Sequence, residues 1–350
     1  MVEQRRKKSV VEERQRKGLG QAGPPLIHIG YHKTGTSWLQ KFLFRNARAG
    51  FMWAGKGTDS PVNRLVATPA LDFDPKAAEA DFASDAARAA RSGLVFVVSL
   101  ERLSGHPFSG GYDSKEMAQR LRAVFPHGRV LVVIREQRSM ILSTYKQYVY
   151  AGGPLPLHRF LDPPTYRRPR IPHFDLRHFE YHRLLAVYQS LFGEQNVLAL
   201  PYESFQADPR AFVTSIAEFA GTTLEDEELE SLPYARRPNL ARRGSIVRTT
   251  RLINRFFVRS DLNPTPLVAS TRAEALCRRC APAVDRVVPR RFEDRSERRL
   301  RATIEDVVGD RYAESNRTSS ALIGVDLGVF GYDMGARHSV RAEDEALALG

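Results

Sequence analysis

The sequence is poor in cysteine. Its 350 residues include only Cys277 and Cys280, which lie in the run CRRC. Two neighbouring thiols cannot form the disulfide framework that stabilises small secreted proteins. A CxxC pair could be redox-active or supply half of a zinc site, but no second Cys/His pair follows at zinc spacing. We therefore interpret both thiols as incidental residues on a helix.

Long apolar runs are also missing. The longest, Leu94–Leu100 and Val130–Ile134, fall far short of the ~18 residues that a membrane span needs. The basic N-terminus is not followed by an apolar segment, so it does not resemble a secretory signal, and we expect a cytoplasmic protein. Residues 1–22 are charged and nearly lack large apolar side chains, which predicts a disordered arm. We expect one domain over 23–334 and a loose tail over 335–350.

Acidic residues are fewer than lysine and arginine, and the net charge is +13. Such an excess favours an anionic partner, which could be nucleic acid, a membrane or a phosphorylated ligand. No helix-turn-helix, RNA-binding or zinc-finger signature accompanies the charge, so we expect no nucleic-acid partner. We favour a polyanionic small molecule, with peripheral membrane contact through the basic arm as the alternative.

Short buried strands alternate with helices along the chain. This order predicts an α/β fold with a mostly parallel central sheet flanked by helices, and a mainly helical elaboration from about Leu224. The expected strands are PPLIHIG, Leu94–Leu100, Arg129–Ile134 and Asn196–Leu200. The expected helices are Thr36–Ala47, Pro75–Arg91, Ser114–Phe125, Arg138–Val149 and Phe174–Leu191. Two loops, Ser104–Asp113 and Gly152–Pro172, are candidate rims of a ligand site.

A glycine-rich turn, Gly30–Ser37, joins the first strand to its helix. Gly30 and Gly35 keep the spacing of the nucleotide-binding loop G-x-x-x-x-G-K-[ST], and Ser37 keeps its place. Such a turn points backbone N–H groups inward, and the helix N-terminus adds partial positive charge. The turn therefore indicates a phosphate site rather than an ordinary strand-to-helix connection.

Two features of a Mg²⁺-dependent nucleotide enzyme are absent. Thr36 occupies the position of the usual lysine, and Lys33 lies inside the loop instead. The runs LVFVVSL and RVLVVIR also end without an aspartate that could hold Mg²⁺. Both observations disfavour a P-loop kinase or nucleotide hydrolase, which stays open as an alternative.

The run KTGTSW resembles the 5′-phosphosulfate loop of sulfotransferases that use PAPS (3′-phosphoadenosine 5′-phosphosulfate). The resemblance implies a P-loop-like fold and a donor-binding loop formed by His32, Lys33, Thr34, Gly35, Thr36, Ser37 and Trp38. It implies that Thr36, Ser37 and the loop amides hold the 5′-phosphate. Lys33 would contact the bridging oxygen and the sulfuryl group, and Trp38 would stack on adenine.

A second motif supports the same family. Arg135 ends an apolar strand and Ser143 follows eight residues later, as in the family's 3′-phosphate site. Arginine offers a planar fork of donors to a phosphate. The segment LPYESF is similar to one whose tyrosine, here Tyr202, reaches adenine. Arg242 and Arg243 resemble basic residues that close over the 3′-phosphate, with Arg236 as a competitor, and the end segment Asn316–Asp333 looks like that of bacterial members.

The expected reaction transfers a sulfuryl group from PAPS to a hydroxyl or amine and releases PAP, without a metal. Glu101 is the first candidate for the general base, His106 the second and His32 the third; an ion pair between Glu101 and an arginine is the alternative. Arginines in the proline-rich loop suit an anionic saccharide or lipid-linked acceptor: Arg167, Arg168 and Arg170. The acceptor could be a saccharide, a glycolipid or a small metabolite. A module that binds PAPS or PAP without catalysis is a further alternative, and the oligomeric state stays open.

Overall fold

The fold is described from a computed structural model, which covers residues 23–55, 57, 59–163, 172–236, 244–268 and 290–335. Several residues singled out in the sequence lie outside this part of the chain: Arg167, Arg168, Arg170, Arg242, Arg243, Cys277 and Cys280. The basic arm and nearly all of the tail lie outside it too. The division into arm, domain and tail therefore stays a prediction.

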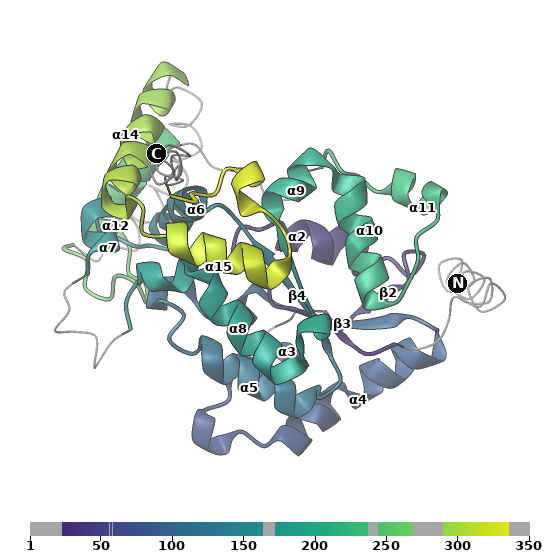
Figure 1. Ribbon diagram of the computed structural model, residues 1–350. Coiled ribbons are helices and arrows are strands. Elements are labelled where there is room, and N and C mark those ends of the chain that lie inside the picture. The colour runs from purple at the N-terminus through teal and green to yellow at the C-terminus, as the bar shows by residue number, and fades with distance from the viewer. Residues whose placement is uncertain are drawn as a thin grey trace, which may run out of the picture.

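A five-stranded sheet forms the centre of the molecule, in the order β2-β3-β1-β4-β5, and every pairing is parallel (Figure 1). The strands are β1 (Leu26–His28), β2 (Phe51–Trp53), β3 (Val95–Ser99), β4 (Arg129–Ile134) and β5 (Val197–Pro201). Strand β1 lies between β3 and β4, with His28 paired to Ser99 on one side and to Leu131 on the other. The predicted α/β fold with a parallel sheet is confirmed.

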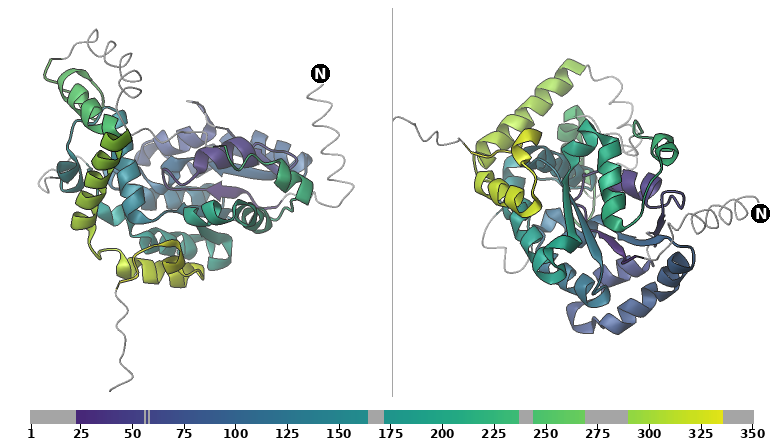
Figure 2. Two further views of the ribbon diagram at one scale, coloured as in Figure 1. Left: turned by 90° about the horizontal axis from the view of Figure 1, so that it is seen from above. Right: turned by 45° about the vertical axis from the view of Figure 1, so that its right-hand side comes forward.

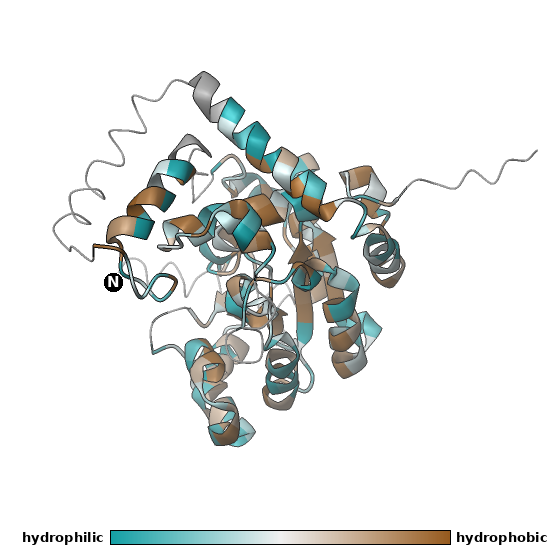
Figure 3. Ribbon diagram, turned by 90° about the vertical axis from the view of Figure 1, so that its left-hand side faces the viewer, coloured by the Kyte–Doolittle hydropathy of each residue, from teal (hydrophilic) through white to brown (hydrophobic). Residues whose placement is uncertain are grey.

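Side chains alternate between the two faces of β4. Val130, Val132 and Ile134 enter one buried cluster, while Leu131 and Val133 enter the other. Such a strand reads as a continuous apolar run because both of its faces are covered. The strands are the most uniformly hydrophobic segments of the fold, whereas most helices mix hydrophobic and hydrophilic residues (Figure 3).

Helices cover both faces of the sheet (Figure 2). One face packs against α4 (Pro75–Arg91), α5 (Ser114–Val124) and α8 (Tyr181–Phe192). The other face packs against α10 (Pro209–Ala220) and against the helical run that follows β1. Helices of the C-terminal part pack on α6 (Gln137–Tyr150) and on α8, as expected for a helical elaboration. The α-helices of the described chain are α2 (Thr36–Trp38), α3 (Pro61–Ala67), α4 (Pro75–Arg91), α5 (Ser114–Val124), α6 (Gln137–Tyr150), α7 (Leu157–Leu161), α8 (Tyr181–Phe192), α9 (Tyr202–Ala207), α10 (Pro209–Ala220), α11 (Asp226–Ser231), α12 (Gly244–Phe257), α14 (Arg290–Val308) and α15 (Ala313–Ile323).

Short helical turns fill several connections. The π-helical turn η1 (Leu39–Leu43) continues α2, so the helix predicted over Thr36–Ala47 ends earlier and changes its hydrogen-bonding pattern after three residues. The remaining turns are 3₁₀ helices: η2 (Ala70–Asp72), η3 (Glu101–Ser104), η4 (Pro107–Ser109), η6 (Leu176–Phe179), η7 (Glu194–Asn196) and η8 (Leu327–Phe330). Turn η6 precedes α8, so the helix predicted from Phe174 starts only at Tyr181.

The buried strand β4 provides a test of the core. Replacing Leu131, whose side chain is fully buried, by Ala is expected to lower the free energy of unfolding by about 2–5 kcal/mol, because the truncation leaves a cavity. Leu71→Ala is the matched control, since Leu71 is fully exposed and its loss should change stability by less than about 0.5 kcal/mol. Urea denaturation followed by circular dichroism measures both. Equal effects at the two leucines would contradict the burial of Leu131 in the core.

Candidate active site

The loop after β1 has a strained and crowded backbone. Lys33 has a φ of 68°, the single positive φ of a non-glycine residue in the described chain. A left-handed lysine costs on the order of 1 kcal/mol or more, and such strain is typical of functional turns. Gly35 has a φ of 84°, and a Cβ there would lie 3.1 Å from the Tyr202 ring. Gly30 has no room for a side chain either, because its Cβ would lie 2.5 Å from His28 Nε2.

Buried polar groups support the base of this loop. His28 is fully buried, and its Nδ1 lies 2.8 Å from the hydroxyl of Ser99. The Gln40 amide donates to the Ser99 hydroxyl at 3.0 Å and to the Ser99 carbonyl at 3.2 Å. These contacts join β1, β3 and the first helical run, so they fix where the loop leaves the sheet.

The two predicted phosphate motifs meet at the carboxyl edge of the sheet. Arg135 follows β4, and its guanidinium donates to the backbone carbonyl of Lys33 at 3.1 Å. The same guanidinium lies over the ring of Tyr202, 5.4 Å from its centroid. Residues that are 102 positions apart in the chain therefore share one site, together with Tyr202 from the end of β5.

Other residues of the loop face inward. The Thr34 hydroxyl donates to the Tyr31 carbonyl at 2.5 Å and so closes the turn. Thr36 is buried, and its hydroxyl has no hydrogen-bond partner in the described chain, whereas Ser37 is half-buried. An inward hydroxyl without a protein partner is suited to an oxygen-rich ligand, because a buried polar atom is costly when unpaired.

Trp38 packs within the protein. Only 3% of the residue is exposed, its indole N–H donates to the Pro233 carbonyl at 3.1 Å, and its ring stacks on Tyr234 at a centroid distance of 5.7 Å. Phe205 lies against the same ring at 4.9 Å. The packing shown for Trp38 anchors the helical run after the loop, and its contact with an adenine stays a prediction.

The three candidate bases lie around the end of β3. His32 and His106 are in ring contact, with centroids 5.6 Å apart. Glu101 opens turn η3 and is half-buried. The alternative pairing of Glu101 with Arg102 is not observed, because Arg102 pairs with Asp113 at 2.5 Å. Among the described residues the Glu101 carboxylate has no hydrogen-bond or ion-pair partner.

The histidines are held in the neutral form. Burial, and then His106, His178 and the cations Lys33 and Arg102, lower the pKa of His32 to about 3. Burial and the charge of Arg102 also lower the pKa of His106. The Nδ1 atom of His106 accepts a hydrogen bond from the Phe108 amide at 3.2 Å, so the neutral ring carries its proton on Nε2. This protonation disfavours His106 as a proton acceptor through Nε2.

Two further predicted residues have no contact with Arg135 among those that the structure shows. Ser143 is half-buried on α6 and forms no hydrogen bond with Arg135. Arg236 is exposed at the edge of the described chain, while its competitors Arg242 and Arg243 lie beyond that edge. The structure therefore brings Lys33, Arg135 and Tyr202 into contact, and the shares of Ser143 and the basic pair stay predictions.

Sequence reasoning missed a group of residues behind Arg135. Glu203 accepts hydrogen bonds from the Glu136 amide and from the Tyr332 hydroxyl, both at 3.1 Å. The Tyr181 hydroxyl donates to the Arg135 carbonyl at 2.6 Å. The signals were present, because Glu203 follows Tyr202 in LPYESF and Tyr332 lies in the final Gly-Tyr-Asp, but neither pattern says what the side chain contacts.

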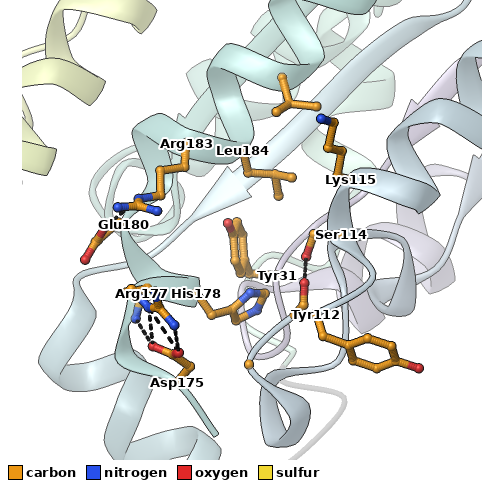
Figure 4. Close-up of a pocket in the computed structure, with 13 residues that line it drawn as sticks. Tyr31, Tyr112, Ser114, Lys115, Asp175, Arg177, His178, Glu180, Arg183 and Leu184 are labelled. Carbon is orange, nitrogen blue, oxygen red and sulfur yellow. Dashed lines mark hydrogen bonds and ion pairs between the residues drawn. The ribbon is translucent and has the colours of Figure 1, made fainter. Parts of the chain in front are cut away.

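A cavity of about 320 Å³ lies beside the loop, between the start of α5 and α8 (Figure 4). Tyr31 and His178 line it, and their ring centroids are 5.1 Å apart. Most of the other charged side chains that line the cavity form ion pairs: Arg177 binds Asp175 and Arg183 binds Glu180, each at 2.6 Å. The arginines of this cavity are thus partly neutralised, in contrast to Arg135, which pairs with no carboxylate in the part of the chain described.

Two features are absent from the described ranges. No group of three or more His, Cys, Asp or Glu side chains in these ranges is arranged to hold a metal ion. None of the helices in the same ranges combines the length and apolar character needed to cross a bilayer.

The comparisons with known proteins identify a family and one similar structure. Residues 24–239 match the family described as "Sulfotransferase domain", which covers the loop, Arg135 and Tyr202. The chain therefore belongs to the sulfotransferase domain family. The crystal structure of a sulfotransferase from Alicyclobacillus acidocaldarius is similar at 15% identity, with a TM-score of 0.48, over 88% of this chain and 99% of that one. No curated protein sequence matches.

The neutral His28 makes stability depend on pH. Burial lowers its pKa to about 3 in the folded chain, whereas an unfolded histidine titrates near 6.5. The unfolded state therefore binds an extra proton between these values, and stability falls as the pH decreases through this window by up to about 1.4 kcal/mol per unit. We expect His28→Gln to reduce the slope of the free energy of unfolding against pH between pH 6.5 and pH 4.5 by up to about 1.4 kcal/mol per unit, while His32, His106 and His178 keep their own contributions.

Urea titrations at several pH values measure this slope. His127→Gln, at an exposed position, is the matched control and should keep the slope of the unmodified protein. If His28→Gln retains the full slope, the buried neutral imidazole is not its source.

Proposed function

We propose that the chain transfers a sulfuryl group from PAPS to an acceptor hydroxyl or amine and releases PAP. The observation that carries the proposal is the contact between Arg135 and the Lys33 carbonyl beside Tyr202. It supports two phosphate-binding elements within reach of one adenosine, which a donor with phosphate groups at both its 5′ and 3′ positions requires. Thr36, Ser37 and the amides of the loop are proposed for the 5′-phosphate, and Arg135 with Ser143 for the 3′-phosphate.

Lys33 is proposed to act on the reacting group. Its left-handed backbone lies at the tip of the loop, and its side chain is exposed. A lysine ammonium placed there can neutralise charge that develops on the leaving phosphate oxygen as the bond to sulfur breaks. The helical run Thr36–Leu43 starts in the same turn and adds partial positive charge. In-line positioning and electrostatics then account for most of the catalysis, as in phosphoryl transfer.

Glu101 is proposed as the general base. Its carboxylate is half-buried at the end of β3 and is not engaged by Arg102. His106 presents a protonated Nε2, and the pKa of His32 is lowered to about 3, so each is a weaker candidate. Glu101 would take the proton of the acceptor as its oxygen or nitrogen attacks sulfur. A saccharide, a glycolipid or a small metabolite is proposed as the acceptor.

Donor binding can be tested by thermal unfolding. PAP is expected to raise the melting temperature by several degrees without Mg²⁺, because a ligand at 100 times its Kd stabilises the folded state by about 2.7 kcal/mol. ATP with Mg²⁺ is the comparison, since β3 and β4 lack the strand-end aspartate of a kinase. A response to ATP with Mg²⁺ but not to PAP would defeat the proposal and favour the kinase alternative.

The chemical step can be tested with a donor labelled on sulfur and a panel of acceptors. Lys33→Ala is expected to lower kcat by about 10²-fold or more, because the leaving oxygen loses its neutralising charge. Glu101→Gln should also lower kcat by about 10²-fold or more, because the amide cannot accept the proton. Both variants should keep the thermal shift with PAP.

His106→Asn is the control for the base, and it should retain most of the activity. A loss at His106 with none at Glu101 would reverse the assignment of the base. Full activity in both the Lys33 and Glu101 variants would show that the site lies elsewhere. A protein that binds PAP but transfers no label to any acceptor would fit the non-catalytic module.

A further inference from the structure

The C-terminal segment reaches the back of the proposed 3′-phosphate site. Tyr332, of which 3% is exposed, donates its hydroxyl to Glu203 Oε2 at 3.1 Å. The other oxygen of Glu203 accepts from the Glu136 amide at 3.1 Å. One carboxylate therefore joins the segment after η8 to the residue that follows Arg135.

Glu203 is connected to the site through two segments of the chain. It follows Tyr202, whose ring lies under the Arg135 guanidinium at 5.4 Å, and it binds the backbone next to Arg135. Arg135 itself is held on its other sides, because its carbonyl accepts from Tyr181 and its guanidinium donates to Lys33. The direction of the arginine thus depends on Glu203 and Tyr181, which hold its backbone, as well as on Lys33 and Tyr202, which contact its guanidinium.

A second set of contacts keeps the segment in place. The side-chain amides of Gln137 and Asn316 pair with each other, and Asn316 donates to the Asp333 carbonyl at 2.8 Å. Arg138 binds the Asp333 carboxylate at 3.2 Å. Because Gln137 and Arg138 open α6 directly after the Arg135 turn, the segment is attached to that turn independently of Glu203.

The charge state of Glu203 makes the tyrosine more than a packing residue. Burial raises the pKa of this carboxyl, whereas hydrogen bonds from Glu136 and Tyr332 and the charge of Arg135 lower it. Loss of the tyrosine hydroxyl removes one of the groups that favour the ionised form. The carboxylate would then hold the Arg135 turn less firmly.

We propose that Tyr332 and Glu203 are positioning residues that aim Arg135 at the 3′-phosphate of the donor. The inference rests on the proposed function, and it assigns a role in donor selection to a segment far from the loop. It requires that the effect of the tyrosine hydroxyl be confined to ligands that carry a 3′-phosphate.

The experiment compares the affinities of PAP and AMP, which differ by the 3′-phosphate, by calorimetry on the full-length chain. Tyr332→Phe is expected to weaken PAP binding by about five- to tenfold and to leave AMP binding unchanged, as the loss of one hydrogen bond predicts. Arg135→Ala should cause the largest loss of PAP affinity relative to AMP affinity, and so it sets the upper limit for the other variants. Glu203→Gln retains the shape of the side chain, and its loss of PAP affinity relative to AMP should lie between those of Tyr332→Phe and Arg135→Ala.

Tyr312→Phe is the matched control. Tyr312 is also buried and donates its hydroxyl, but to the Leu176 carbonyl at 2.9 Å, so it should lose comparable stability without changing the ratio of the two affinities. An unchanged ratio in Tyr332→Phe, or an equal loss of PAP and AMP binding, would overturn the inference. If the unmodified protein binds PAP no better than AMP, the proposed donor fails first and the inference fails with it.

Discussion

The parallel pairing of β1 with β4 is the constraint on which the site depends. His28 pairs with Leu131, and the Ile29 amide continues the ladder to the Leu131 carbonyl at 3.0 Å. Because the strands are parallel, both leave the sheet at the same edge. The chain goes from β1 to β2 and β3 on one side and then crosses to β4 on the other, so β1 lies at the point where the strand order reverses. Such points are where open α/β sheets form ligand crevices.

The site also depends on keeping its histidines neutral. His28, His32, His106 and His178 all have a lowered pKa, with burial as the largest cause in each case. The cationic side chains near the loop are therefore Lys33, Arg102 and Arg135, of which Arg102 is paired with Asp113. Neutral rings meanwhile pack closely against each other, as His32 and His106 do, without mutual repulsion.

The sequence predicted the parts of the fold that local pattern determines. Helix α4 has the predicted bounds because Asp74 caps it and Pro75 occupies its first position. Strand β4 also has the predicted bounds, because its apolar run is bounded by charged residues. Strand β2 was not predicted, since three residues carry no measurable period. The change from α2 to the π-helical turn η1 leaves no local signal either. The contact of Arg135 with Lys33 could be expected from two motifs, but their separation of 102 residues means that only the sheet order brings them together.

Residues that support the motif residues were the hardest to predict, because their roles depend on contacts with distant parts of the chain. Glu203 is a polar residue after a strand, and only the fold shows that it bridges the Glu136 amide and Tyr332. An arginine that binds an anionic ligand must not be paired with a carboxylate of the protein, because such an ion pair neutralises its charge. Here the nearest carboxylates are committed elsewhere: Glu136 caps α6 by accepting from the amides of Arg138 and Ser139, and Glu203 holds two donors. Among the described residues the Arg135 guanidinium contacts the Lys33 carbonyl and the Tyr202 ring and pairs with no carboxylate, which leaves its charge available for the phosphate that the proposed function assigns to it.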